Sequence, residues 1–256
     1  MKIFDTHAHY DNPAFDMDRE ELLGSLRDNG IEAVVNVGAS IKTTKNTLDL
    51  VSKYSFIYGS VGVHPSETGE LNEEKLEWLG QVAGRDGIVA VGEIGLDYHW
   101  QEPDKAVQRR WFARQLDLAR QVKLPVIIHS RDAAKDTLDI MKGERAGELG
   151  GVIHCFSYGK EIAREYLDMG FYLGIGGVAT FENAKKLKEV VAYMPLERIV
   201  LETDCPYLSP APYRGKRNSS LNLPWVVAAV SRLKGIDEEK VIAAANQNAR
   251  ALYRLS

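Results

Sequence analysis

Two histidines two residues apart follow a short apolar stretch near the start of the sequence. The stretch covers residues 3–6, and the histidines are His7 and His9. In a β-strand, residues i and i+2 point to the same side, so these imidazoles would converge on one point, as two ligands of one metal ion must. A His-x-His sequence also occurs by chance on surfaces, so the rest of the chain has to decide between a metal site and a coincidence.

Other residues of the types that bind metals follow apolar runs later in the chain. They are His64, Glu93, Asp97, His129, His154, Glu202 and Asp204. Five of the six histidines come immediately after such a run, and His99 is a looser case. An unpaired buried carboxylate is costly, so packing alone gives no reason for Glu93 to stand between Val91 and Ile94, whereas a nearby cation would.

The chemistry of these side chains limits the cofactors that they could bind. Imidazole nitrogen and carboxylate oxygen without thiolate exclude an iron–sulfur cluster and fit Zn, Mn, Co or Mg, with imidazole favouring the transition metals. The set holds too many ligands for one tetrahedral site. Two ions about 3.5–4 Å apart that share a carboxylate would use all of them.

Strand-like and helix-like stretches alternate from one end of the chain to the other. Several apolar runs are nearly continuous, as in strands buried on both faces of a parallel sheet; the eight runs are residues 3–6, 33–37, 56–63, 88–94, 125–128, 151–153, 171–175 and 198–201. Helical patterns cover residues 18–29, 43–53, 73–83, 104–122, 133–141, 160–169, 181–192, 223–234 and 238–253. Eight cycles without a break in composition predict an α/β fold, a (β/α)8 TIM barrel that forms a single domain over residues 1–256.

A TIM barrel would give the polar residues a common location. Its active site lies at the C-terminal ends of the strands, which is where the histidines and carboxylates occur. Closure of the ring places the first strand beside the eighth, so His7, His9 and Asp204 are expected to be neighbours. A doubly wound open sheet is the rival fold, but it would require a glycine-rich phosphate-binding turn after the first strand, and the sequence has none.

The bulk properties are those of an ordinary globular protein, with 45% hydrophobic and 27% charged residues. A formal net charge of −4 argues against a surface devoted wholly to nucleic acid. It does not exclude a nucleic-acid enzyme, because divalent cations and a local basic loop can supply the positive field. The sequence has two cysteines without a CxxC motif and shows no leader pattern, which predicts a cytoplasmic location. It has no apolar run of membrane length, so we expect no membrane association. No obligate protein partner is evident from the sequence.

Seven short motifs occur in one order over nearly the whole chain. They are residues 4–9 (Phe-Asp-Thr-His-Ala-His), 62–65 (Gly-Val-His-Pro), 92–98 (Gly-Glu-Ile-Gly-Leu-Asp-Tyr), 129–133 (His-Ser-Arg-Asp-Ala), 154–157 (His-Cys-Phe-Ser), 202–208 (Glu-Thr-Asp-Cys-Pro-Tyr-Leu) and 214–218 (Arg-Gly-Lys-Arg-Asn). In these motifs the chain resembles the TatD family of metal-dependent deoxyribonucleases, which sits among the amidohydrolase-like barrels. The family commonly continues the last motif with Glu-Pro, whereas this chain has Ser219 and Ser220 there, so any role of that glutamate in the loop or in substrate binding is in doubt.

The resemblance implies two divalent cations (Mg, Mn or Zn) and hydrolysis of phosphodiester bonds. One ion would be held by His7, His9, Glu93 and Asp204, and the other by Glu93, His129 and His154. Glu93 would take the bridging place that a carboxylated lysine holds in many related barrels. The absence of that lysine argues against the phosphotriesterase and dihydroorotase types.

The expected mechanism is attack on phosphorus by a water whose pKa is lowered by two cations, which also bind the scissile phosphate. Asp204 would be a metal ligand and either accept the proton of that water or act as a ligand only. His64 would orient the phosphate or the water, although a structural role beside Pro65 is the alternative. Glu202 is expected either to support the ligands from behind or to be a buried strand residue, and not to catalyse the reaction.

Substrate binding is expected to involve basic residues near the strand ends. Arg214, Lys216 and Arg217 follow the eighth strand and would overhang the site, and Arg131 is a second candidate; the alternative is a solvated loop. A rim with few basic residues suits the end of a DNA strand. We therefore expect a deoxyribonuclease, an exonuclease on single-stranded or frayed DNA, with 3′-5′ polarity implied by the resemblance. The aromatic residues near strand ends, which could stack on bases or serve only local packing, are Tyr98, Trp100, Phe156 and Tyr207.

Two other functions fit parts of the same sequence. The first is an amidohydrolase-type enzyme that cleaves a small amide, lactone or ester, for which the same metal centre would polarise a carbonyl. The basic loop at residues 214–217 favours a polyanion over such a substrate. The second is a barrel that binds metal or nucleic acid without turnover, against which the complete ligand set argues.

Overall fold

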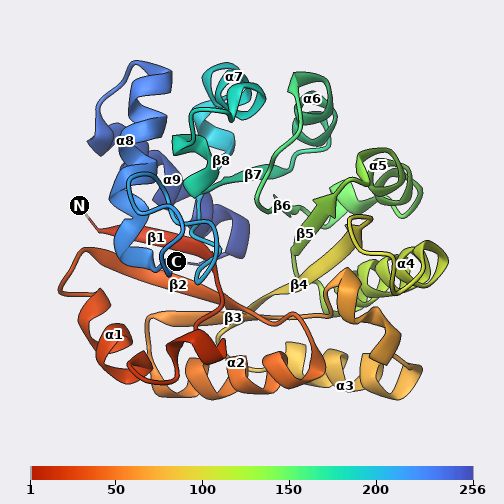
Figure 1. Cartoon of the computed structure of the whole chain (residues 1–256). Helices are drawn as coiled ribbons and strands as arrows, with labels where there is room; N and C mark the ends of the chain where they lie inside the picture. Colours follow the sequence, from red (N-terminus) through yellow and green to blue (C-terminus); the bar gives the residue numbers. More distant parts are fainter. Residues whose placement is uncertain (1, 256) are drawn as a thin grey trace.

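Eight parallel strands form one sheet in sequence order, and helices surround it (Figure 1). The structure is a computed structural model that describes residues 2–255. The strands are β1 (Ile3–Ala8), β2 (Ile31–Val37), β3 (Ile57–Val61), β4 (Ile88–Asp97), β5 (Val126–Arg131), β6 (Gly151–Ile153), β7 (Tyr172–Ile175) and β8 (Ile199–Leu201). The helices are α1 (Arg19–Leu26), α2 (Ile41–Lys53), α3 (Glu73–Ala83), α4 (Lys105–Val122), α5 (Ala134–Gly143), α6 (Lys160–Asp168), α7 (Lys185–Tyr193), α8 (Leu223–Lys234) and α9 (Glu238–Tyr253).

The sheet closes where β1 meets the segment that follows β8, and we call this junction the seam. The Asp204 amide donates to the His7 carbonyl at 2.9 Å, and the His9 amide donates to the Cys205 carbonyl at 2.8 Å. Lower in the seam, the Thr6 hydroxyl donates to the Leu201 carbonyl at 3.0 Å. The nearly closed eight-stranded ring confirms the predicted TIM barrel.

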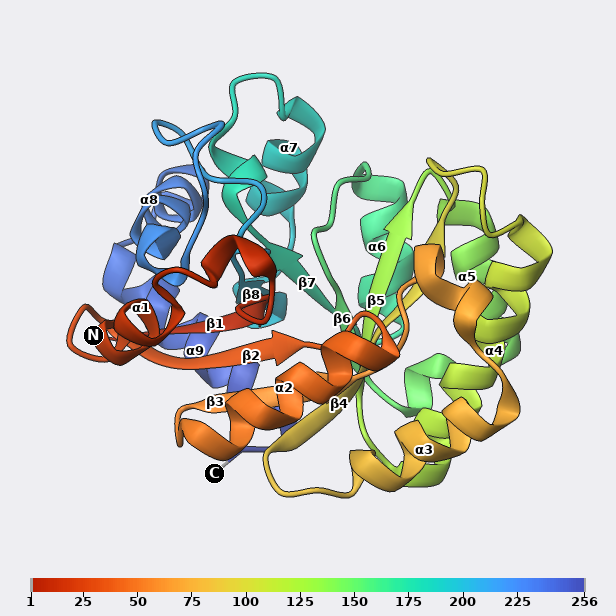
Figure 2. The ribbon, with the colours of Figure 1, turned by 60° about the horizontal axis from the view of Figure 1, so that its bottom comes forward.

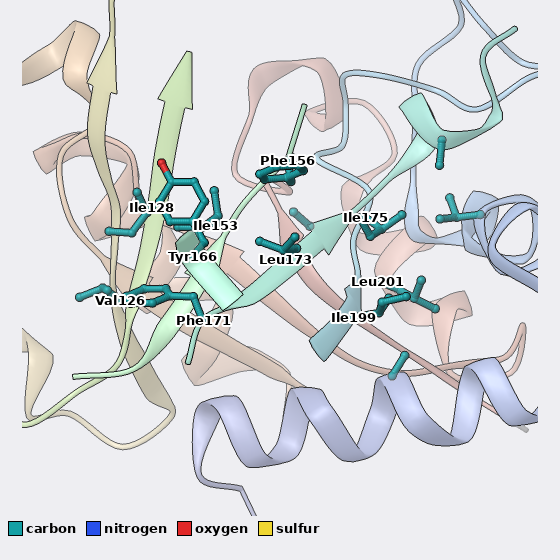
Figure 3. Close-up of a cluster of buried hydrophobic side chains, with 14 of the residues drawn as sticks. Val126, Ile128, Ile153, Phe156, Tyr166, Phe171, Leu173, Ile175, Ile199 and Leu201 are labelled. Atoms are coloured by element: carbon teal, nitrogen blue, oxygen red, sulfur yellow. The ribbon is translucent and has the colours of Figure 1, made fainter. Parts of the chain in front are cut away.

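The hydrophobic core lies on both sides of the strands, inside the barrel and between the barrel and its helices. Every residue of β1, β4, β6 and β8 is buried, as expected for parallel strands covered on both faces. Figure 3 shows part of this core, in which Tyr166 of α6 lies close to apolar side chains of β5, β6 and the start of β7. The helices contribute apolar stripes; α4, for example, buries Trp111, Phe112, Leu116 and Leu118.

Three strands are longer than the hydrophobic pattern indicated. β1 includes His7, β4 continues to Asp97 and β5 continues to Arg131, so several site residues lie inside strands and not just beyond them. Pairing explains the difference, because the polar ends of β4 and β5 still form a ladder in which Gly95 pairs with His129. Helix α1 ends at Leu26, earlier than predicted, and a turn leads to Gly30, which adopts φ of 88°.

The strands all end at one rim of the barrel. In Figure 2 the arrowhead of β5 points toward this rim, and the loop between β8 and α8 lies at the same end of the molecule. None of the helices in residues 2–255 is both long and apolar enough to cross a membrane.

Candidate metal centre

A cavity of about 760 Å³ opens at the C-terminal rim of the barrel. The predicted metal-site and catalytic residues that line it are His9, His64, Glu93, His129, His154 and Asp204. His7 lies beneath them, fully buried, with its ring stacked on that of His154 at 3.6 Å between centroids. The barrel therefore brings together side chains from β1, β4 and β5 and from the segments after β3, β6 and β8.

Four potential metal-ligand atoms, from three separate segments of the chain, lie close together, and we call this group the first cluster. The Nε2 atoms of His7 and His9 are 3.1 Å apart. Glu93 Oε2 lies 3.5 Å from His7 Nε2 and 3.8 Å from His9 Nε2. Asp204 Oδ1 lies 3.8 Å and 3.4 Å from the same two nitrogens. Ligands at the corners of a tetrahedron, each about 2.1 Å from a metal ion, lie about 3.4 Å apart. The first cluster therefore has the dimensions of a metal-binding site.

The second oxygen of Glu93 faces a different group of imidazoles, the second cluster. Glu93 Oε1 lies 2.8 Å from His129 Nδ1 and 3.4 Å from His154 Nε2. His64 Nε2 is farther away, at 3.9 Å. One carboxylate thus offers one oxygen to each cluster, which is the arrangement that two neighbouring cations need if they share a ligand.

Partners on the far side of the rings hold several of these imidazoles in place. His9 Nδ1 is 3.1 Å from the Val37 carbonyl, which fixes that nitrogen as the donor and leaves Nε2 free to ligate. In the second cluster, His129 Nε2 is 3.1 Å from Asp97 Oδ2, and His154 Nδ1 is 3.2 Å from Glu202 Oε1. A carboxylate behind a metal-binding imidazole orients the ring and raises its basicity.

The charges of the site also fit a bound cation. Burial opposes the charge of Glu93, yet the imidazoles of His154 and His64 hold the pKa of its carboxyl well below its ordinary value. Burial likewise favours neutral His9 and His154, but the carboxylates of Asp204 and Glu202, respectively, raise the pKa of His9 to about 9 and that of His154 to about 10. No lysine or arginine in residues 2–255 forms an ion pair with Glu93 or Asp204. Buried carboxylates that draw protons onto imidazoles require positive charge, which divalent cations would supply.

Replacing Glu202 with glutamine should weaken metal binding without removing a ligand. The Cys155 amide donates a hydrogen bond to Glu202 Oε1 at 2.6 Å, and the amide oxygen of glutamine can still accept it. The variant does, however, lose the negative charge behind His154. Loss of such a supporting carboxylate typically costs about 10–100-fold in metal affinity. Titration with Zn²⁺ in the presence of a competing indicator would measure the metal affinity. Glu161→Gln, on the exposed face of α6, is the control. Equal affinities of the two variants would contradict a supporting role.

The structure separates the predicted substrate-binding residues. Arg131 lines the cavity and is exposed, whereas Arg214, Lys216 and Arg217 are not among its lining residues. Arg217 forms an ion pair with Asp18, with 2.7 Å between Nη1 and Oδ1, and also donates to the Ala14 carbonyl at 2.8 Å. The guanidinium of Arg214 lies over the ring of Phe181 at 4.4 Å.

A buried polar network at the seam was not predicted. The carboxylate of Asp5 accepts from the Thr203 amide at 3.0 Å and from the Thr203 and Ser220 hydroxyls at 2.6 Å each. Burial raises the pKa of Asp5 to about 7 despite these bonds. Ser220, at the departure from the family motif, therefore helps to fix the segment that carries Asp204. Asp5 lies within an otherwise apolar stretch, which is the one signal that could have identified it.

The position of the Glu202 side chain depends on Gly174, a residue that no sequence motif identified. A Cβ atom on Gly174 of β7 would lie 2.1 Å from Glu202 Oε2. Only glycine leaves enough room there for the carboxylate that stands behind His154.

Comparisons with known proteins identify the family of the chain. The family model described as TatD related DNase matches residues 4–254. A relative from Bacillus subtilis, an uncharacterized metal-dependent hydrolase named YabD, is 41% identical over 99% of this chain and 100% of its own length. A relative from Cronobacter sakazakii is named 3′-5′ ssDNA/RNA exonuclease TatD, and it is 32% identical over 98% of this chain and 97% of its own length.

Solved structures show the same architecture. The crystal structure of YjjV, a TatD homolog from Escherichia coli, matches with a TM-score of 0.93 and 30% identity, covering 99% of this chain and 98% of that one. A TatD family hydrolase from Entamoeba histolytica matches with a TM-score of 0.91 at 23% identity, over 100% of this chain and 99% of that one, which shows the shared fold. The chain belongs to the TatD family of metal-dependent hydrolases.

Proposed function

We propose that the protein is a divalent-metal-dependent deoxyribonuclease, a 3′-5′ exonuclease that hydrolyses phosphodiester bonds at the end of single-stranded or frayed DNA. The observation that carries the proposal is the position of Glu93, with Oε2 among the ligand atoms of the first cluster and Oε1 facing the second. The relative named as a 3′-5′ exonuclease supports the choice of substrate.

The residues of the two clusters would hold one cation each, the first with His7, His9, Glu93 and Asp204 and the second with Glu93, His129 and His154. Two bound cations would neutralise the phosphate and lower the pKa of a water, so that it attacks at neutral pH. Asp204, which lines the cavity, would accept the proton of that water. Although burial opposes its charge, the hydrogen bond with His9 lowers the pKa of this carboxyl, which keeps it ionised as a metal ligand requires.

His64 has a donor available for the phosphate. Its Nδ1 accepts a hydrogen bond from the Ser66 amide at 3.2 Å, so the proton of a neutral ring is on Nε2. Nε2 lies at the cavity, 3.9 Å from Glu93 Oε1. We infer that Nε2–H orients a phosphate oxygen, which also explains how one histidine can serve both the loop and the substrate.

Replacing Arg131 with alanine should lower kcat/KM on single-stranded DNA about tenfold, mostly through KM. Its guanidinium has no ion-pair partner in residues 2–255 and lies at the cavity, where a charge-assisted bond to a phosphate oxygen would contribute about 1.5 kcal/mol. Steady-state kinetics would measure the loss, with partial recovery in Arg131→Lys. Arg164→Ala on α6 is the matched control, and an equal effect of the two alanine variants would argue against phosphate binding by Arg131.

An assay on end-labelled DNA tests the proposed function. Single-stranded DNA labelled at its 5′ end, incubated with the protein and Mg²⁺, Mn²⁺ or Zn²⁺, should give a ladder of products that shortens with time, and a chelator should abolish it. Labelled RNA and blunt duplex DNA are the comparison substrates. Hydrolysis of model lactones or amides with no release of nucleotides would instead favour a small-molecule hydrolase, and two bound metals with no hydrolysis would favour a binding protein.

A further inference from the structure

A second cavity, of about 490 Å³, lies along α7 and α8 and is bounded by the loops that follow β7 and β8. These two helices pack side by side, with the β8–α8 loop beside them (Figure 1). The side chains of the cavity that matter here are Thr180, Lys188, Pro212, Trp225, Ala229 and Arg232. It shares no lining residue with the metal cavity.

The charge of the second cavity is positive and uncompensated. Lys188 and Arg232 line it, and neither has an ion-pair or hydrogen-bond partner for its side chain in the described part of the chain. No carboxylate is among the lining residues, and the rest of the wall is made of small or apolar side chains. Such a surface favours an anionic ligand with an apolar portion, because the cations stay unpaired only until a phosphate or carboxylate arrives.

An exposed aromatic face accompanies the two cations. Trp225 at the start of α8 is 44% exposed and lies edge-to-face against Tyr213, with ring centroids 5.9 Å apart. The basic loop also turns to this side, since Arg214 lies over Phe181, the residue after Thr180. Exposed aromatic rings beside unpaired cations are the surface on which single-stranded nucleic acid binds, with bases stacked on the rings and phosphates on the cations.

A short piece of chain joins the two cavities. Tyr207 and Leu208 line the metal cavity, and Ala211 and Pro212 line the second. Three residues of extended chain span at most about 10 Å, so the edges of the cavities are no farther apart than that. At about 3.4 Å per stacked nucleotide, a strand would cross this interval in about three nucleotides.

We propose that the second cavity is an auxiliary binding site for single-stranded DNA, which holds the substrate strand about three or more nucleotides away from the end under hydrolysis. Trp225 stacks on a base, while Lys188 and Arg232 contact phosphates. The inference rests on the proposed function, because it takes the strand end to lie at the metal centre. It gives the exonuclease a preference for substrates long enough to reach both cavities.

Substrate length provides the test. The variants are Trp225→Ala and the double variant Lys188→Ala/Arg232→Ala. The double variant Lys185→Ala/Lys186→Ala is the control, because it removes the same charge from the exposed surface of α7 without touching the cavity. Binding of a fluorescent 12-nucleotide oligothymidylate is measured by anisotropy in EDTA, and kcat/KM is measured on the 12-mer and on a dinucleotide with metal present.

Each cavity variant should weaken binding of the 12-mer about tenfold and lower the ratio of kcat/KM on the 12-mer to that on the dinucleotide by a similar factor. The slope of log K against log salt should fall by about 1.4 in Lys188→Ala/Arg232→Ala, as expected for two lost contacts to a single strand. An unchanged ratio and unchanged binding, or an equal loss in the control, would overturn the auxiliary site. If binding of the 12-mer depends on the cavity but no DNA is hydrolysed, the proposed function fails, and the cavity is a single-strand-binding site with no role in hydrolysis. If hydrolysis is normal and the variants match the wild type, only the auxiliary site fails.

Discussion

Replacing Asp204 with asparagine is expected to lower kcat for nucleotide release from single-stranded DNA about 1000-fold or more. Asparagine keeps the size of the side chain but has no negative charge for His9, 3.4 Å away, and cannot accept a proton. Charge stabilisation at a metal centre is worth several kcal/mol, and about 4 kcal/mol corresponds to a factor of 1000 in rate. Single-turnover kinetics at saturating metal would measure the loss.

The barrel should remain folded in Asp204→Asn, because the seam at this position is held by backbone bonds such as that from the Asp204 amide to the His7 carbonyl. Circular dichroism and Tm test this. Asp132→Asn, at an exposed carboxylate that follows β5, is the control and should retain normal rates. Near-normal hydrolysis by Asp204→Asn would exclude Asp204 from both roles, as metal ligand and as proton acceptor.

Replacing Glu93 with glutamine is expected to reduce binding of both cations. The change neutralises the one carboxylate that serves both clusters, so each cation loses a charged ligand. Since loss of a residue that only supports a ligand costs about 10–100-fold in affinity, loss of this shared ligand should cost more than about 100-fold at each site. Elemental analysis after equilibrium dialysis against Zn²⁺ or Mn²⁺ would give the number of ions bound.

His129→Ala provides the comparison for Glu93→Gln. His129 belongs to the second cluster only, so this variant should retain one ion at close to wild-type affinity while losing the other. The bridging role of Glu93 would be refuted if Glu93→Gln also kept one ion at wild-type affinity. In that case the two clusters would be independent sites, or only one of them would bind metal.

The barrel was predictable because each strand is a short apolar run that can be recognised from its local sequence alone. β6, β7 and β8 were placed within a residue, and the ring follows from their alternation with helices. The gathering of His7, His9 and Asp204 was predictable for the same reason, since ring closure alone brings the two ends of the sheet together.

What could not be predicted depends on contacts between distant loops. Arg217 was expected over the cavity, but its pair with Asp18 lies outside the cavity lining, and no local pattern signals a partner nearly 200 residues away. The place of Glu202 behind His154 likewise requires the space that Gly174 leaves on the next strand. Side-chain pairs of this kind depend on how distant segments pack together in the folded protein. The hydrophobic pattern of the sequence does not indicate them.

The seam also has a consequence for the order of events during synthesis of the protein. The seam joins Asp5 to Thr203, which is 198 positions later in the chain, and Asp204 is the residue after Thr203. A growing chain therefore carries His7 and His9 long before the carboxylate that completes their cluster has been made. The ribosome-bound intermediate cannot assemble the full set of ligands, so the first cluster stays incomplete until almost the entire barrel has emerged.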